Sequence, residues 1–170
     1  MTRLYLLRHA KARWAEPGSR DYDRALDPSG RADADEVAAA MLLAGHVPDK
    51  VLCSGARRTR ETWEVAARHL QVADIVYSDA LYSSDAAGYL DVVRAHGGGG
   101  SALVVGHNPM MEDLATALSR DGERKALAAV ARGFPTCGLA VIRFSTPLAG
   151  IAPEDGYLEE FFAPGDLEDE

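Results

Sequence analysis

Apolar residues in this sequence occur mainly in short continuous runs, separated by longer stretches in which apolar and polar positions mix. Short apolar runs between turn residues are typical of buried strands, whereas apolar residues at every third or fourth position are typical of helices. Strands are therefore predicted over residues 3–8, 50–54, 74–78, 101–107, 138–145 and 156–164. Helices are predicted from Asp27 or Ser29 to Gly45, and over 56–70, 84–97, 108–119 and 124–132.

The alternation of these strands and helices predicts the fold class. Strands that alternate with helices usually pair in parallel, and the helices cover the faces of the sheet. We expect an α/β fold over residues 1–164, a single-domain three-layer sandwich with a mostly parallel central sheet flanked by helices and with antiparallel closing strands. Residues 14–26 are predicted to form a loop over the end of the first strand, and the acidic C-terminal tail, 165–170, is predicted to be disordered.

The composition narrows the classes of partner. A net charge of −8 argues against nucleic acid or an anionic membrane as the main partner. No apolar stretch approaches the length of a membrane span, and the chain enters a strand at once without a signal peptide, so we expect a cytoplasmic protein. In that reducing compartment, Cys53 and Cys137 are expected to be buried free thiols.

Polar residues follow three of the predicted strands at the point where each strand ends. They are Arg8 and His9, then Ser54, Arg57, Arg58 and Arg60, and finally His107 and Asn108. Because ligands of α/β proteins bind beyond the carboxyl ends of the strands, these residues are expected to meet at one edge of the sheet. Guanidinium groups bind phosphate oxygens in pairs and keep their charge, so the set predicts a site for a dianionic phosphoryl group. One neutral imidazole could attack phosphorus while the other stabilises the charge on the oxygens.

Simpler roles remain open for each of these residues. His9 could satisfy the end of a strand, and His107 could be structural. Arg57 and Arg60 fit exposed charges on a helix, where Arg57 can pair with Glu61 four residues later. The convergence of the three sets at one sheet edge, more than any single residue, supports the phosphoryl site.

Other candidate motifs predict no cofactor and no metal. The sequence contains no His-x-His or His-Glu-x-x-His pattern of metal ligands. His46, His69 and His96 have no comparable neighbours and are expected on the surface. The glycine run at 97–100 precedes a strand and lacks the lysine of a phosphate-binding loop, so it is predicted to be a turn.

Four segments carry a resemblance to a known family. "LLRHAKA" contains Arg-His followed by the small Ala10, and "VLCSGARRTRETW" contains Ser54, Arg58 and Thr62. "LVVGHNP" contains His107, and "FPTCGLAVI" precedes the closing strands. In this order they resemble the Arg-His-Gly signature and the later elements of the histidine phosphatase superfamily, a phosphoglycerate mutase-like group, and in particular its SixA-type branch of phosphohistidine phosphatases.

The resemblance implies a role for each matching residue. His9 would be the nucleophile and would be phosphorylated transiently. Arg8, Arg58 and His107 would form the phosphate pocket, with Ser54 as a further substrate-binding residue. Among the three arginines that follow the second strand, Arg58 is selected by this match and not by spacing alone.

A general acid is the family feature with the weakest match. Many members of the superfamily carry a Glu or Asp acid after the third strand, and the short region here offers Asp79 and Asp85. Asp85 is the candidate acid, although it also suits the N-cap of the next helix. SixA-type proteins are similarly short and lack the acid. A phosphoramidate needs it less, because an imidazole leaving group is less basic than an alkoxide.

These observations predict a phosphatase that hydrolyses phosphohistidine on a protein, for instance a histidine phosphotransfer domain. The first alternative is a phosphomonoesterase that acts on a small phosphorylated molecule. The second is a phosphate-binding module without turnover, against which the intact set of His9, Arg8, Arg58 and His107 argues.

Overall fold

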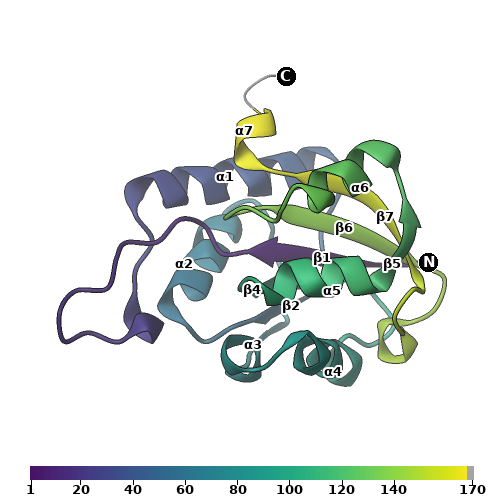
Figure 1. Ribbon diagram of the computed structural model, residues 1–170, viewed down its shortest axis with the longest axis horizontal. Helices are drawn as coiled ribbons and strands as arrows, with labels where there is room; N and C mark the ends of the chain where they lie inside the picture. Colours follow the sequence, from purple (N-terminus) through teal and green to yellow (C-terminus); the bar gives the residue numbers. More distant parts are fainter. Residues whose placement is uncertain (168–170) are drawn as a thin grey trace.

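A computed structural model of the chain describes residues 1–167, and its centre is a sheet of seven strands (Figure 1). The strands are β1 (Thr2–Arg8), β2 (Lys50–Cys53), β3 (Ile75–Tyr77), β4 (Ala102–Gly106), β5 (Ser119–Gly122), β6 (Leu139–Phe144) and β7 (Gly156–Phe162). Their order across the sheet is β3-β2-β4-β1-β6-β7-β5. β1, β2, β3 and β4 pair in parallel, whereas β6 runs antiparallel to both β1 and β7. The predicted mostly parallel sheet with antiparallel closing strands is therefore confirmed.

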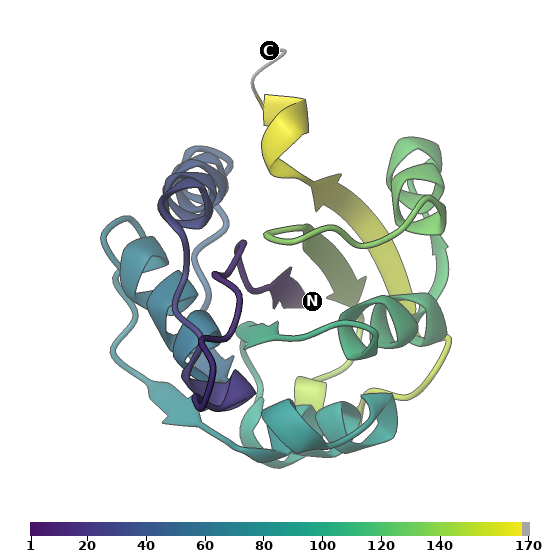
Figure 2. The same ribbon diagram turned by 60° about the vertical axis from the view of Figure 1, so that its left-hand side comes forward.

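Helices cover both faces of this sheet (Figure 2). They are α1 (Pro28–Leu43), α2 (Arg57–Ala66), α3 (Ala80–Ser83), α4 (Ala86–His96), α5 (Met110–Leu118), α6 (Arg124–Ala131) and α7 (Pro164–Leu167), with 3-10 turns η1 (Asp21–Asp23) and η2 (Leu148–Gly150). α1 begins where the sequence predicts, because Asp27 accepts a hydrogen bond from the Gly30 N–H at 2.7 Å.

The side chains of β1 show how the three layers are held together. Leu4 and Leu6 point into a core that α4, α5 and α6 cover. Tyr5 and Leu7 point into a second core that α1 and α2 cover. Successive residues of a strand face opposite sides of the sheet, so a fully apolar strand buries both faces. The continuous apolar run at the start of the chain thus has a structural cause, and the three-layer sandwich is confirmed.

Several features of the structure differ from the prediction. β5 is missed, because its sequence is polar and it pairs only with β7 at the sheet edge. Residues 165–167 of the predicted disordered tail belong to α7, and residues 168–170 lie outside the described part of the chain. The prediction that His46 lies on the surface is wrong. Its ring is buried against the Tyr5 hydroxyl, with Nδ1 3.2 Å from that oxygen.

Two further expectations concern the cysteines and the membrane. Cys53 and Cys137 are buried free thiols, as predicted. Burial raises the pKa of both thiols. Among the helices that the structure describes, none combines the length and the apolar character that crossing a membrane requires.

The close packing around Gly106, the last residue of β4, gives a prediction about stability. A Cβ atom at this position would lie 2.7 Å from the Tyr89 hydroxyl oxygen and 2.8 Å from the terminal methyl carbon of Met111. Because both neighbours are fully buried, we expect Gly106→Ala to lower the free energy of unfolding by about 1–3 kcal/mol. Urea denaturation followed by circular dichroism measures this change.

Gly99→Ala is the matched control for this measurement. A Cβ at Gly99 meets no atom within 4 Å, so its effect should stay within about 0.5 kcal/mol. If both substitutions lowered the free energy of unfolding by the same amount, the close contacts around Gly106 would not be the cause of the loss.

Candidate active site

The carboxyl ends of β1, β2 and β4 lie at one edge of the sheet, and the predicted site residues follow them. The parallel register pairs Arg8 with Gly106. The His9 N–H then donates to the Gly106 carbonyl at 3.0 Å, and the Ser54 N–H donates to the Val105 carbonyl at 3.0 Å. These two backbone bonds hold the residues that follow β1 and β2 against the end of β4.

The imidazole of His9 is held in one tautomer. Its Nδ1 lies 2.7 Å from the Ala10 carbonyl oxygen, which can only accept, so Nδ1 carries the proton. Nε2 therefore keeps its lone pair, and no hydrogen bond from the described residues occupies it. Burial lowers the pKa of His9 to about 4, and the charges of Arg58 and Arg8 act in the same direction, although the bond to Ala10 opposes them. His9 is thus neutral at neutral pH, with a nitrogen that can act as a nucleophile.

His107 is oriented by Ser54 and Tyr89. Its Nε2 lies 2.9 Å from the Ser54 Oγ, which also accepts a 3.3 Å hydrogen bond from the Ala56 N–H. In the tautomer in which the Ser54 hydroxyl donates to Nε2, the Nδ1 of His107 carries the proton and is an N–H donor. The backbone N–H of His107 donates to the Tyr89 hydroxyl at 3.1 Å, and this hydroxyl donates to the Leu81 carbonyl.

The two imidazoles are neighbours, with ring centroids 5.3 Å apart. Burial, together with smaller effects of His9 and Arg58, lowers the pKa of His107 to about 3. Both rings are therefore uncharged at neutral pH, which allows one to attack a phosphoryl group and the other to donate a hydrogen bond to it.

Arg58 lies in the first turn of α2, and Thr62 ties this helix to the backbone that follows β1. The Thr62 hydroxyl accepts from the Ala10 N–H at 3.0 Å and donates to the Arg58 carbonyl at 2.7 Å. A single buried hydroxyl thus sets the distance between the His9 segment and the helix that carries Arg58. Arg57 and Arg60, by contrast, are exposed, and Arg57 pairs with Glu61 at 3.5 Å as predicted.

Arg8 is positioned by the turn that precedes β6. One η nitrogen of its guanidinium donates to the Phe134 carbonyl at 2.8 Å, and the Asn108 side-chain amide donates to the same oxygen at 3.1 Å. Burial lowers the pKa of Arg8, and the negative charge of Glu112 opposes this. The guanidinium nevertheless stays protonated at neutral pH, as arginine does in proteins.

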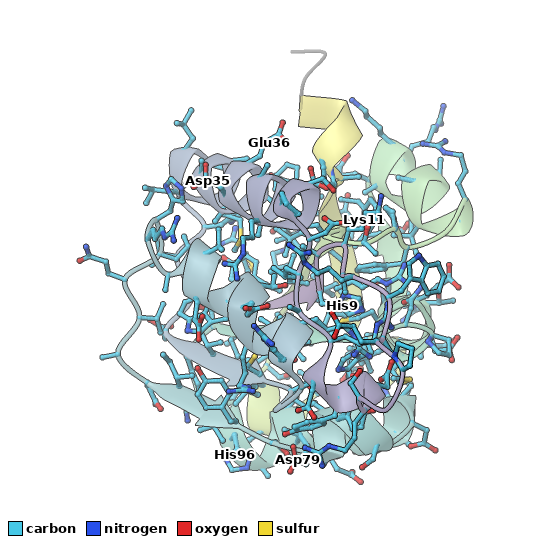
Figure 3. The ribbon with its side chains drawn as sticks, turned by 90° about the vertical axis from the view of Figure 1, so that its left-hand side faces the viewer. His9, Lys11, Asp35, Glu36, Asp79 and His96 are labelled. Carbon is cyan, nitrogen blue, oxygen red and sulfur yellow. The ribbon has the colours of Figure 1, made fainter. Side chains whose placement is uncertain are left out.

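Arg8, His9, Arg58 and His107 line one cavity of about 400 Å³. The other residues on its wall are Lys11, Ala12, Trp14, Arg24, Asn108 and Thr136. Figure 3 shows His9 and Lys11 near the middle of the view and Asp79 at its lower margin. Four cations and two neutral imidazoles face this space, and none of the described residues on the wall is a carboxylate.

Three residues that line this cavity each have a buried nitrogen atom without a hydrogen-bond partner within residues 1–167. The atoms are Nε of Arg8, Nε of Arg58 and Nδ1 of His107. Leaving a buried donor unpaired costs roughly 1–3 kcal/mol, so unpaired donors are rare and need a reason. Two arginines and a histidine with spare donors around one cavity, beside uncharged His9, suit a tetrahedral oxyanion.

Three predicted residues lie away from the cavity wall. Ser54 contacts His107 and does not itself line the cavity. Asp85 caps α4, where its Oδ1 accepts a 2.9 Å hydrogen bond from the Gly88 N–H. Asp79 accepts from the Tyr22 hydroxyl at 2.7 Å. The structure therefore brings four of the predicted side chains together and leaves both candidate acids outside.

Three residues of the site are absent from the sequence analysis. Lys11, Trp14 and Arg24 come from the segment between β1 and α1, of which residues 14–26 are predicted only as a loop. A loop has no periodicity from which the direction of a side chain can be inferred. The available signal is the density of basic residues directly after the Arg-His pair, at positions 11, 13, 20 and 24, in a chain that is acidic as a whole.

A grouping suited to a metal ion is not found in the described part of the chain, where three or more His, Cys, Asp or Glu side chains never gather in that way. The donors around the cavity are instead N–H groups and cations, which suit an anion.

Comparison with known proteins agrees with this arrangement. The family model of the histidine phosphatase superfamily, branch 1, matches residues 4–86, which include Arg8, His9 and Arg58. A candidate phosphohistidine phosphatase SixA from Agrobacterium tumefaciens, known from its crystal structure, is 40% identical in sequence. The match covers 96% of this chain and 99% of that one, with a TM-score of 0.81.

Two more relatives are similar over most of their length. A second candidate SixA, from Nakamurella multipartitia, is 32% identical over 96% of each chain, with a TM-score of 0.81. An uncharacterised protein of Mycobacterium tuberculosis H37Rv is 34% identical over 164 residues, which are 93% of this chain and 99% of that protein. With such relatives along nearly its whole length and the family's segments meeting in one cavity, the chain belongs to branch 1 of the histidine phosphatase superfamily.

Proposed function

We propose that this protein is a phosphohistidine phosphatase that acts on a phosphorylated protein through a covalent intermediate on His9. The observation that carries the proposal is the lone pair of His9 Nε2 beside a cavity lined by Arg8, Arg58 and His107, each of which has a buried nitrogen without a partner in the described chain. A nucleophile and a set of oxyanion donors at one place are what phosphoryl transfer needs. The similarity to the Agrobacterium SixA candidate supports the same activity.

The reaction proceeds in two displacements at phosphorus. Nε2 of His9 forms a bond to phosphorus, and the phosphorus–nitrogen bond of the substrate breaks with its electron pair going to the leaving imidazole, which takes a proton from water. Arg8, Arg58 and His107 donate to the phosphoryl oxygens while charge spreads over them. A water molecule then attacks phosphorus, the bond to His9 breaks, and inorganic phosphate leaves with Nε2 free again.

The preference for a phosphoramidate follows from the residues on the cavity wall. An alkyl phosphate needs a proton for its alkoxide leaving group, and a general acid typically supplies about 10²–10⁴-fold in rate. The described wall offers no carboxylate for this purpose, and Asp85 caps a helix. A substrate with a less basic leaving group, such as phosphohistidine on a phosphotransfer domain, therefore suits the site better than a small phosphate monoester.

The role of His9 gives the first prediction about activity. His9→Ala should lose nearly all hydrolysis of a phosphohistidine protein, because no other group on the cavity wall combines a lone pair with this position. The wild type should also become transiently phosphorylated on His9. Loss of this label in acid and its survival in base distinguish phosphohistidine from phosphoserine or phosphothreonine. His96→Ala is the matched control, since this exposed imidazole lies at the end of α4, and it should retain full activity. Turnover by a folded His9→Ala variant would contradict the assignment.

The lowered pKa of His9 gives a spectroscopic prediction. A pKa of about 4, against an ordinary value of 6.5, means that His9 loses its proton only when the pH rises through about 4. At pH 6 the ring should already be neutral and in the Nδ1–H tautomer. Long-range proton–nitrogen correlation spectra report both the charge and the tautomer. An imidazolium signal from His9 at pH 6, or the Nε2–H tautomer, would show that Nε2 has no lone pair for attack and would contradict its role as the nucleophile.

Asp85 separates the proposed activity from a small-molecule phosphomonoesterase. Asparagine caps a helix about as well as aspartate, so Asp85→Asn should preserve α4 and leave hydrolysis of phosphohistidine within a few-fold of the wild type. Loss of a true general acid would cost about 10²–10⁴-fold instead. The wild type should also hydrolyse unactivated alkyl phosphates slowly, and efficient turnover of them would favour the phosphomonoesterase.

A further inference from the structure

The segment between β1 and α1 folds back on itself and reaches the cavity. Its two ends are joined where the Arg13 N–H donates to the Ala25 carbonyl at 2.8 Å and where Ala12 bridges to Leu26. The Leu26 N–H donates in turn to the buried Glu61 carboxylate of α2 at 2.9 Å. This segment, residues 13–25, is therefore fixed at its base, and the short η1 turn within it carries an acidic residue to the site.

That residue, Asp21, binds Arg58 through two separate oxygens. One η nitrogen of Arg58 donates to the Asp21 backbone carbonyl at 2.9 Å, and the other donates to Asp21 Oδ2 at 3.0 Å. The Tyr82 hydroxyl donates to the same Oδ2 at 2.9 Å, and an η nitrogen of Arg24 donates to Oδ1 at 3.1 Å. One carboxylate thus connects the arginine of α2, the arginine of the loop and the tyrosine of α3.

Asp21 lies outside the cavity wall, although both of its arginine partners are on that wall. An arginine has five N–H donors, of which the contacts with Asp21 use two on Arg58. The Nε–H of Arg58 remains buried and unpaired, and each η nitrogen keeps a second hydrogen. The carboxylate therefore holds one end of the guanidinium and leaves other donors for a ligand.

Charge gives a reason for this arrangement. Arg8, Arg24 and Arg58 converge on one small space, where like charges repel each other. A carboxylate between two of them offsets part of that repulsion without entering the cavity. Burial alone would raise the pKa of Asp21, but the hydrogen bonds from Tyr82, Arg24 and Arg58 lower it to about 2, so the carboxylate is ionised at neutral pH.

We propose that Asp21 is a positioning residue, which holds Arg58 and Arg24 in the geometry in which both bind the phosphoryl group. This inference rests on the proposed function, because it assumes that an oxyanion occupies the cavity. It adds Arg24 to the groups that bind this oxyanion. The opposite role would be a gate, in which the Asp21 carboxylate competes with the phosphoryl group for Arg58.

The two roles predict opposite changes in oxyanion affinity. Asp21→Asn keeps the size of the side chain and removes its charge. If Asp21 is a gate, the substitution releases Arg58 and tightens oxyanion binding. A purely long-range effect of removing a negative charge would also tighten it. If Asp21 positions the arginines, the loss of charge-assisted hydrogen bonds should weaken binding of orthovanadate about tenfold. Isothermal titration calorimetry with orthovanadate measures this dissociation constant.

Asp23→Asn is the matched control on the same turn. The Asp23 side chain pairs with the exposed Arg20 at 2.9 Å and, among the described contacts, has no hydrogen bond or ion pair with Arg24 or Arg58. Its substitution removes the same charge two residues away and should change the dissociation constant by less than about twofold. Asp21→Glu, which restores the charge on a longer side chain, should recover part of the affinity. Tighter or unchanged binding in Asp21→Asn would overturn the proposal.

A double substitution shows whether Asp21 acts through its partner. In an Arg58→Ala background, Asp21→Asn should weaken vanadate binding much less than it does in the wild type, because one of the groups that it holds is gone. Equal losses in both backgrounds would mean that Asp21 only supports the fold, and that result would refute the positioning role.

Failure of the positioning role can be distinguished from failure of the proposed function. A wild type that binds vanadate but does not hydrolyse phosphohistidine would contradict the activity alone, while the comparison of Asp21 variants would still test the positioning role. A wild type that binds no oxyanion would overturn both.

Discussion

The parallel pairing of β1 with β4 is the interaction on which the site depends. Arg8 is level with Gly106 in this register, and the His9 N–H extends the pairing by one bond beyond the strand. A shift of one residue would turn every side chain of β1 to the other face of the sheet, moving Leu4 and Leu6 out of one core and Tyr5 and Leu7 out of the other. The register that completes both cores is thus also the one that places His9 beside His107.

The site concentrates positive charge in an acidic protein, and its surroundings limit the cost of doing so. Both histidines are neutral, because burial and the nearby arginines lower the pKa of each ring. The arginines keep their charge but are anchored by carbonyl oxygens and by Asp21, which satisfy part of their donors. The Nε atoms of Arg8 and Arg58 stay unpaired within the described chain, and both arginines line the cavity. An anion bound there would accept hydrogen bonds from these arginines and offset part of the cost of burying them.

Much of the site could be predicted from the sequence, since it lies at the ends of strands. A buried parallel strand is recognisable as an apolar run, and topology then brings Arg8, His9 and His107 to one edge. Topology offers three arginines after β2, and only the family resemblance selects Arg58 among them. Lys11, Arg24 and Asp21 could not be predicted in this way, because the loop that carries them has no repeating pattern. His46 shows a related limit. It follows the glycine after α1, a position that suggests exposure, yet Tyr5 and Glu160 of the sheet lie beside its ring.

Thr62 has a consequence for how substrate reaches the cavity. Its hydroxyl joins the backbone after His9 to the first turn of α2, and both of these contacts are buried. The nucleophile and the helix of Arg58 therefore behave as one rigid body, and the cavity cannot widen by separating them. Residues 13–20, in contrast, are exposed along their whole length, and Trp14 at the rim is 90% exposed. The exposed side of the cavity is therefore the side that this loop forms, so the loop is the part of the site that an incoming protein substrate would contact first.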